Sequence, residues 1–204
     1  MATRFSHPQG EAQYAWLKPI LDAFYISDAQ VEEHLGKLAR KGVTPACHKG
    51  CHACCLRPTV PFTEPELMAI SWYASEVLTG EARATVKHRL RNHDQTLECP
   101  FLVDRACSIY PVRPLICRQF LVKGEPCGVD EDITDTRLDD VIPLPRDTVI
   151  RPVAMRLMDH YKFKSATAKR KAFEAGFIAQ NAREMHEYEW NTIADTMDHF
   201  DNAA

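Results

Sequence analysis

Four of the chain's eight cysteines fall in one short stretch, Cys47-His-Lys-Gly-Cys51-His-Ala-Cys54-Cys55. The other four follow in a proline-rich stretch. Thiolates are soft ligands for zinc and for iron-sulfur clusters, and short spacings let the backbone turn around an ion. We therefore interpret all eight cysteines as metal ligands: Cys47, Cys51, Cys54, Cys55, Cys99, Cys107, Cys117 and Cys127.

Disulfide bonds are the main alternative use of so many cysteines, and the sequence argues against them. The first residues of the chain lack the apolar segment of a secretory signal, so we expect a cytoplasmic protein, and thiols stay reduced in the cytosol. We also expect no membrane partner, because no run of about 18 apolar residues occurs. No cysteine stands apart from the two groups as an isolated nucleophile would.

The number of thiols leaves the kind of metal centre open. A tetrahedral Zn²⁺ takes about four ligands, and so does a [4Fe-4S] cluster, so eight thiols allow one site with spare cysteines or two sites. The side chains of the neighbours Cys54 and Cys55 diverge, which makes it difficult for both to bind one small ion. This favours an iron-sulfur cluster, most simply [4Fe-4S], with Zn²⁺ as the alternative.

Histidine and arginine side chains flank the cysteines. His48 and His52 are capable ligands, yet with eight thiols present we expect them to lie outside the coordination shell. Arg113 and Arg118 flank Cys117, where their charge would offset that of the thiolates and their N–H groups would bond to sulfur or to backbone carbonyls. A role in binding an anionic cofactor or substrate is the second interpretation of these two arginines.

The elements that must position these residues are mainly helical. Spacing of apolar residues and capping signals predict helices over 11–24 (bent or interrupted by Pro19), 27–42 (capped by Ser27 with Gln30), 63–80 (with a capping box of Thr63 and Glu66), 81–96, 154–161, 166–182 and 183–200. The helix over 81–96 carries Val86 and Leu90 among many charges and is expected at the surface. The last helix is expected to bury Tyr188 and Phe200. Strand-like runs occur over 59–62 and 115–122.

The middle of the chain reads as irregular backbone. Residues 97–152 contain seven of the thirteen prolines, and loops of this length in a compact domain need function or a metal to order them. An acidic tract that begins at Asp130 lacks the residue order of a calcium loop and is expected to be a solvated loop. The fold class we expect is mainly α, with helices at both ends packing around a Pro- and Cys-rich metal-binding middle.

Composition supports one globular unit. With 204 residues, of which 45% are hydrophobic and 26% charged, the chain has the size of a single domain. We expect a domain over 1–204, a metal-binding region over 43–128 and helical flanks over 1–42 and 150–204. The net charge of -3 and the scattered Lys and Arg residues make nucleic acid a poor partner.

The cysteines and their neighbours resemble a known family. The Cys-x3-Cys-x2-Cys-Cys run, then Cys99-Pro-Phe-Leu, then Cys107-Ser-Ile-Tyr-Pro-Val-Arg-Pro-Leu-Ile-Cys117-Arg, resemble the CxxCxxCC cysteine-cluster family, the YkgJ-type proteins described as zinc- or iron-chelating. Three residues rather than two separate Cys47 from Cys51 here. The resemblance implies metal binding, and a related branch, which is similar to flagellin lysine methylases, links a like cluster to methyl transfer.

Two classes of function follow. The first is a metal-binding protein with an iron-sulfur cluster, of redox or methyl-transfer type, acting on a protein or small-molecule substrate; whether it is an enzyme stays open. The second is a zinc-stabilised module, not catalytic, that binds a protein partner. The spacing Cys-x3-Cys-x2-Cys also occurs in radical enzymes that cleave S-adenosylmethionine, but the helix-rich pattern lacks the alternating strands of their barrel. Among the cysteines, Cys127 is expected to be the most dispensable.

Overall fold

The structure is a computed structural model that describes residues 1–48, 50–56, 58–129 and 131–203. It confirms the mainly α class, with little sheet. The described helices are α1 (Pro8–Gln13), α2 (Leu17–Ala39), α3 (Glu64–Trp72), α4 (Gly80–Arg91), α5 (Leu115–Gln119), α6 (Ile133–Thr136), α7 (Arg151–Leu157), α8 (Ala166–Glu174), α9 (Phe177–Gln180) and α10 (Asn191–Ala203). The described strands are β1 (Pro61–Thr63), β2 (Leu102–Val103), β3 (Ala106–Cys107) and β4 (Ala182–Glu184).

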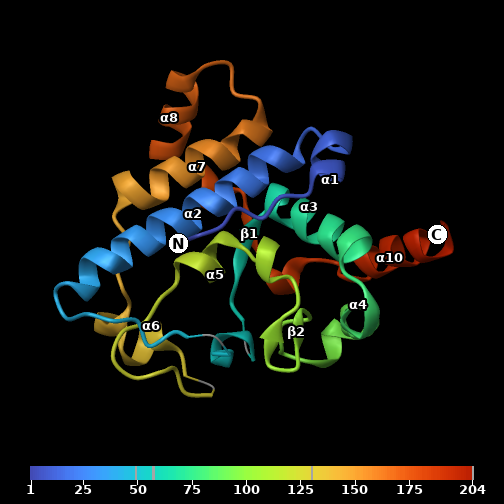
Figure 1. The fold of residues 1–204 in the computed structure, drawn as a ribbon, viewed down its shortest axis with the longest axis horizontal. Coiled ribbons are helices and arrows are strands. Elements are labelled where there is room, and N and C mark those ends of the chain that lie inside the picture. The colour runs from blue at the N-terminus through green and yellow to red at the C-terminus, as the bar shows by residue number, and fades with distance from the viewer. Residues whose placement is uncertain (49, 57, 130, 204) are drawn as a thin grey trace.

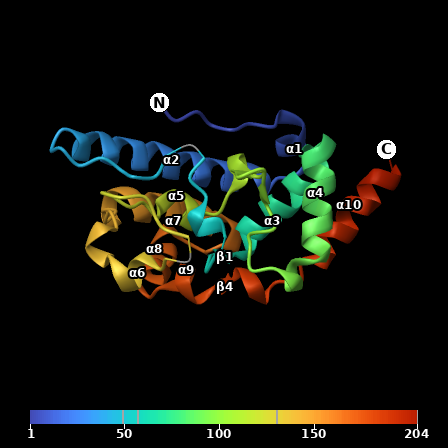
Figure 2. The same ribbon diagram turned by 90° about the horizontal axis from the view of Figure 1, so that it is seen from below.

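The main hydrophobic core joins both ends of the chain to its middle. The long helix α2 lies alongside α7, and α10 packs against α4 (Figures 1 and 2). Leu17 and Ile20 of α2 are fully buried in this core, together with Met197 of α10 and Val112 from the proline-rich middle. A smaller cluster beside it holds Met158 and the α8 residue Phe173. No described helix is both long and apolar enough to cross a bilayer.

The N-terminal helices begin and end at other residues than predicted. The interruption falls at residues 14–16, and Pro19 lies in the first turn of α2, where a backbone N–H has no helical partner to lose. The predicted helix start at Ser27 is wrong, because α2 runs through it without a break. Ser27 is fully buried, and its hydroxyl accepts a hydrogen bond from Gln119 Nε2 (3.1 Å) instead of capping a helix. Gly42 follows the end of α2 with a φ of 79°, as a stop signal should.

The capping box predicted at Thr63 is confirmed. Glu66 Oε2 accepts hydrogen bonds from the Thr63 backbone N–H (2.8 Å) and from its hydroxyl (2.6 Å). The helix then continues as a π-helical turn over Tyr73–Val77. In α4, Val86 and Leu90 are buried, on a helix that its many charges led us to expect at the surface. That helix ends at Arg91, and a 3₁₀ turn over His93–Gln95 takes the place of its expected last turn.

Three expectations in the second half of the chain are wrong. The predicted helix over 166–182 splits into α8 and α9 at Gly176, whose φ of 79° no ordinary helix accepts. Residues 182–184 form β4, which pairs antiparallel with β1 and places Arg183 opposite Phe62, so α10 begins only at Asn191. The run 115–122 begins with α5 instead of a strand.

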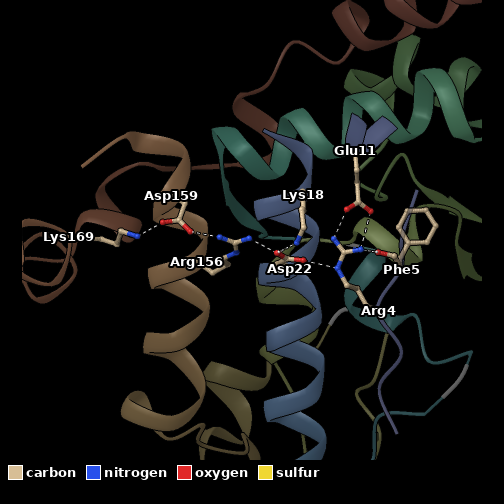
Figure 3. A network of polar contacts seen from close by, with 8 residues as sticks. All are labelled: Arg4, Phe5, Glu11, Lys18, Asp22, Arg156, Asp159 and Lys169. Atoms are coloured by element: carbon tan, nitrogen blue, oxygen red, sulfur yellow. Dashed lines mark hydrogen bonds and ion pairs between the residues drawn. The ribbon is translucent and has the colours of Figure 1, made fainter. Parts of the chain in front are cut away.

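A chain of ion pairs crosses the outer side of α2 and ties the N-terminal arm to the C-terminal half (Figure 3). Asp22 of α2 accepts hydrogen bonds from Arg4 Nε (2.7 Å), from Lys18 Nζ (2.8 Å) and from Arg156 of α7. Burial opposes the ionisation of Asp22, but these three cationic donors outweigh it and bring its pKa to about 2. Arg156 in turn pairs with Asp159, which also binds Lys169.

Asp22 should therefore stabilise the fold in a pH-dependent way. Its folded-state pKa of about 2 lies below the ordinary 3.8, so its contribution is complete above about pH 4 and is lost as the pH falls toward 2. We expect Asp22→Asn to lower the free energy of unfolding by about 2 kcal/mol at neutral pH, since one pKa unit corresponds to about 1.4 kcal/mol.

Urea unfolding of both proteins between about pH 7 and pH 2 checks this, with Glu33→Gln on the exposed face of α2 as the control. The difference between Asp22→Asn and the unchanged protein should shrink as the pH falls. An equal loss from both variants would contradict the role of Asp22.

Candidate metal centre

The first four cysteines lie on two consecutive turns that follow α2. The Cys51 N–H bonds to the His48 carbonyl (3.0 Å), and the Cys55 N–H bonds to the His52 carbonyl (2.8 Å) within a 3₁₀ turn over Ala53–Cys55. Each histidine braces its own turn: Nδ1 of His48 donates to the Ala46 carbonyl and Nδ1 of His52 to the Gly50 carbonyl, both at 2.9 Å. Each histidine thus uses one of its two ring nitrogens to hold the loop.

The later cysteines are held by short regular elements. Cys107 lies in the β2–β3 hairpin opposite Leu102. The two residues between the strands, Asp104 and Arg105, both have left-handed backbone, with φ of 48° and 60°, the conformation that a tight two-residue hairpin turn requires. Cys117 lies on α5, and Cys127 follows on irregular backbone.

The structure brings the two groups of cysteines together. The Cys99 N–H donates to the Cys55 carbonyl at 2.8 Å, which places the first late cysteine directly beside the last early one. The flanking backbone is joined as well, because the Ala46 N–H donates to the Val122 carbonyl (2.7 Å) and Pro45 forms an antiparallel bridge with Lys123. Segments about 45 to 75 residues apart in the chain thus meet, in a region with few other backbone ladders.

All eight cysteines are described, and all are free thiols. A hydrogen bond between the vicinal thiols lowers the pKa of Cys54 and raises that of Cys55. Burial raises the pKa of the other cysteines that shift, and the negative charge of Cys54 raises each of them further; the affected thiols are Cys47, Cys99, Cys107, Cys117 and Cys127.

Two sets of thiols can be distinguished around Cys54 by the charges that act on each of them. Cys127 is influenced by Cys47 and Cys51. Cys117 is influenced by Cys99 and Cys107, and Cys55 by Cys99 and Cys117. Cys54 and Cys117 reach solvent, while the other six side chains are half-buried. Cys54 and Cys117 are therefore the most accessible of the eight cysteines.

The donor set fits a thiophilic metal. Burial raises the pKa of Cys99 to about 12, so its thiol is neutral at physiological pH unless a cation compensates its negative charge. Soft thiolates are the ligands of zinc and of iron-sulfur clusters. Among the described residues, no group of three or more His, Cys, Asp or Glu side chains is already arranged as a complete site. Coordination would therefore require the sulfurs to move closer together.

Arg118 and Arg113 hold the backbone around Cys117. The Arg118 side chain is 1% exposed and pairs with Asp28 of α2, while its Nε and Nη2 donate to the carbonyls of Arg113 (2.9 Å) and Pro111 (2.7 Å). Arg113 also pairs with Asp28 (3.1 Å) and covers the Tyr110 ring at 3.8 Å. Donation to backbone carbonyls was one of the predicted roles for these arginines. Cofactor binding by Arg113 and Arg118 stays a prediction.

A buried carboxylate fixes the start of α5. Glu66 is 3% exposed, and its Oε1 accepts a hydrogen bond from the Leu115 N–H at 2.8 Å while Oε2 binds Thr63. Burial raises the pKa of Glu66, against which these hydrogen bonds and the charge of Arg118 act. Glu66 therefore ties the first turn of α3 to the helix that carries Cys117.

The acidic tract is not the plain solvated loop that was predicted. Asp130, its first residue, lies outside the described residues. Beyond it, Asp132 caps the short helix α6, whose Ile133 is 3% exposed. Arg137 binds Glu131 (2.8 Å) and Asp140 (2.8 Å) and donates to the carbonyls of Glu125 and Pro126. Arg137 thereby folds the tract back onto the segment that leads to Cys127.

Sequence reasoning missed three of these supporting residues. Asp28 gave no signal, because its partners lie 85 and 90 residues away. Glu66 was recognised only as part of a capping box, and Arg137 only as part of a charged loop. Each of the three makes contacts that local spacing does not reveal.

The fold and the site together define a mainly α protein whose middle is a thiol-rich candidate metal centre. Residues 46–137 match the family model CxxCxxCC, described as "Putative zinc- or iron-chelating domain". This match, which covers a little less than half of the chain, is to the same family that the cysteine pattern had indicated. Neither the curated proteins nor the solved structures gave a match.

A substitution of Asp28 tests whether its ion pair with Arg118 stabilises the position of α5. We expect Asp28→Ala to lower the free energy of unfolding by about 3 kcal/mol, because Arg118 is then buried without its partner. Asp195→Ala, at an exposed position of α10, should change stability little.

Metal content tests separately whether Asp28 also positions Cys117. Metal bound per chain, measured by elemental analysis, should fall in Asp28→Ala but not in Asp22→Asn, although both variants lose stability. Equal metal content in the two variants would assign Asp28 to stability alone.

Proposed function

We propose that the eight cysteines bind an iron-sulfur centre, most simply a [4Fe-4S] cluster. The observation that supports this most directly is the hydrogen bond from the Cys99 N–H to the Cys55 carbonyl (2.8 Å), which joins the two cysteine groups. The ligands in the proposal are thiolates alone, as is usual for such clusters. The matched family description supports zinc or iron without choosing between them.

The two sets of thiols offer a place for both vicinal cysteines. One set contains Cys47, Cys51 and Cys127, and the other contains Cys55, Cys99, Cys107 and Cys117. In this proposal Cys54 joins the first set while Cys55 belongs to the second. Their thiols are hydrogen-bonded to each other, so the divergence predicted from the sequence is wrong and the vicinal pair would connect the two sets. Bound metal would stabilise thiolates that burial otherwise keeps protonated.

The second candidate is a protein stabilised by zinc that acts as a binding module. The arrangement in two sets favours it. The first set with Cys54, and the second set as it stands, each contain about four thiols, the number that a tetrahedral zinc site needs. In that case the metal would shape the surface of the middle region. A role in the cytoplasm, and redox or methyl-transfer chemistry for the first candidate, remain part of the proposal.

The metal itself distinguishes the two candidates. Protein purified without oxygen should be brown, absorb in the visible region and contain iron and acid-labile sulfide, because thiolate-to-iron charge transfer is coloured. Colourless protein with stoichiometric zinc would contradict the iron-sulfur proposal and support the zinc module. In either case the metal should be released as the pH falls, because protons compete for the thiolates.

Single substitutions separate the two sets of thiols. We expect Cys107→Ser to lower metal content and helicity together, since metal binding contributes to folding. Cys127→Ser should lower metal content and helicity less than Cys107→Ser does, if a single cluster binds to the set that contains Cys55, Cys99, Cys107 and Cys117. Loss of half of the metal in each variant would indicate two independent sites.

Circular dichroism and elemental analysis of the same samples measure these effects. Ser108→Ala, a neighbour of Cys107 with no thiol, is the control. Unchanged metal content in Cys107→Ser would show that the late cysteines do not bind the metal.

A further inference from the structure

A second candidate site lies away from the cysteines. A groove of about 680 Å³ is formed by α3 and its π-helical turn, by the segment 14–16 and by residues 183–200. None of the eight cysteines lines it. In Figures 1 and 2, α3 and α10, which contribute to its walls, lie on the side of the molecule that holds the C-terminus.

Aromatic side chains dominate the groove. All three tryptophans of the chain line it, Trp16, Trp72 and Trp190. Tyr188 and Phe200, which the sequence predicted to be buried, are only half-buried here. Tyr188 stacks on Phe62 with ring centroids 4.7 Å apart and donates its hydroxyl to the Phe62 carbonyl (2.8 Å), so this wall of the groove is rigid.

The charges that line the groove are mostly negative. Four carboxylates line it, namely Glu64, Glu76, Glu187 and Glu189. The lining contains one cation, Arg183, which is already engaged with Glu187 (3.5 Å) and with the Tyr188 ring (5.2 Å). Glu64 and Glu189 are exposed and make no ion pair with a described residue. The groove therefore has an excess of negative charge beside the half-buried rings of Trp16, Tyr188 and Phe200, while Trp72 and Trp190 are buried in the core.

We propose that this groove binds a basic, amphipathic peptide segment of a partner protein. Apolar side chains of such a segment would pack on the half-buried Trp16, Tyr188 and Phe200, as in other grooves that bind helices. Its Lys or Arg side chains would face Glu64 and Glu189 and contact the aromatic faces. Aromatic residues are also the commonest anchors of protein interfaces.

Charge complementarity selects this occupant over others. An acidic or purely apolar segment would leave the carboxylates unpaired or bring like charges together. A second copy of the chain is less well matched, because the protein carries a net charge of -3. None of the contacts proposed for this groove involves a cysteine.

The probe is a peptide of about 14 residues, long enough for a helix, in which Leu and Lys are spaced to give one apolar and one basic face. A matched peptide carries Glu in place of each Lys. Binding to the full chain is followed by fluorescence anisotropy with labelled peptide and by tryptophan emission with unlabelled peptide. Trp16 is half-buried at the groove, whereas Trp72 and Trp190 lie in the core, so a change in emission on binding reports mainly on Trp16.

The double variant Glu64→Gln/Glu189→Gln should bind the Lys peptide about three- to tenfold more weakly, as expected for the loss of two exposed charge pairs. The control Glu81→Gln/Glu184→Gln removes the same charge at exposed positions outside the groove. It should bind as the unchanged protein does. Thermal unfolding of all three proteins verifies that each is folded.

Binding of the Lys peptide with a tryptophan shift, together with the loss in the first variant alone, supports the proposal. Equal binding of the Glu peptide, or equal weakening in both variants, overturns it. Equal binding of free butylamine would reassign the groove to small cations. A dimer in sedimentation that shields the tryptophans would reassign it to self-association.

Discussion

The middle of this protein depends on one buried cation, the guanidinium of Arg118. A charge with 1% exposure is tolerated only when it is paired and its hydrogen bonds are satisfied. Asp28 of α2 and the carbonyls of Pro111 and Arg113 provide these partners, and the Phe24 ring lies 4.5 Å from the guanidinium. Burial, together with the neighbouring charge of Arg113, still lowers the pKa of Arg118 to about 10. The requirement to satisfy this group fixes α5 against α2.

The same principle explains how so irregular a region is ordered. Helix α5 has five residues, too few to be stable by itself, and the loop before Cys99 has little regular structure. Polar side chains from distant elements supply the missing hydrogen bonds: Glu66 for the Leu115 N–H, and Arg137 for the carbonyls of Glu125 and Pro126. These anchors bring the thiols near one another. A bound metal would add its binding free energy to a region that is already partly ordered.

Local signals predicted local features well. The capping box at Thr63 depends on residues three positions apart, and the structure confirms it. The predicted cap at Ser27 failed because a tertiary contact with Gln119 uses its hydroxyl. Likewise the run that begins at Leu115 has strand-like composition, yet Glu66 and Arg118 hold it as a helix.

The sequence likewise predicted only part of the candidate site. Residue type and order were enough to identify the cysteines and to relate them to the family that residues 46–137 match. The proximity of Cys99 to Cys55 depends on a backbone hydrogen bond between residues 44 positions apart, and no local pattern encodes it. The aromatic groove escaped prediction because the half-buried rings of Tyr188 and Phe200 read as ordinary core residues.

The metal centre and the groove share one structural element, the helix α3. Its first turn contains Glu66, whose Oε1 holds the start of the helix that carries Cys117. The next residues, Leu67 and Met68, line the groove. Because Glu66 is rigidly bonded to both Thr63 and Leu115, a displacement of α3 at the groove would also alter the position of α5. Any such coupling acts equally in both directions, so that metal binding and peptide binding would affect each other's affinity by the same factor.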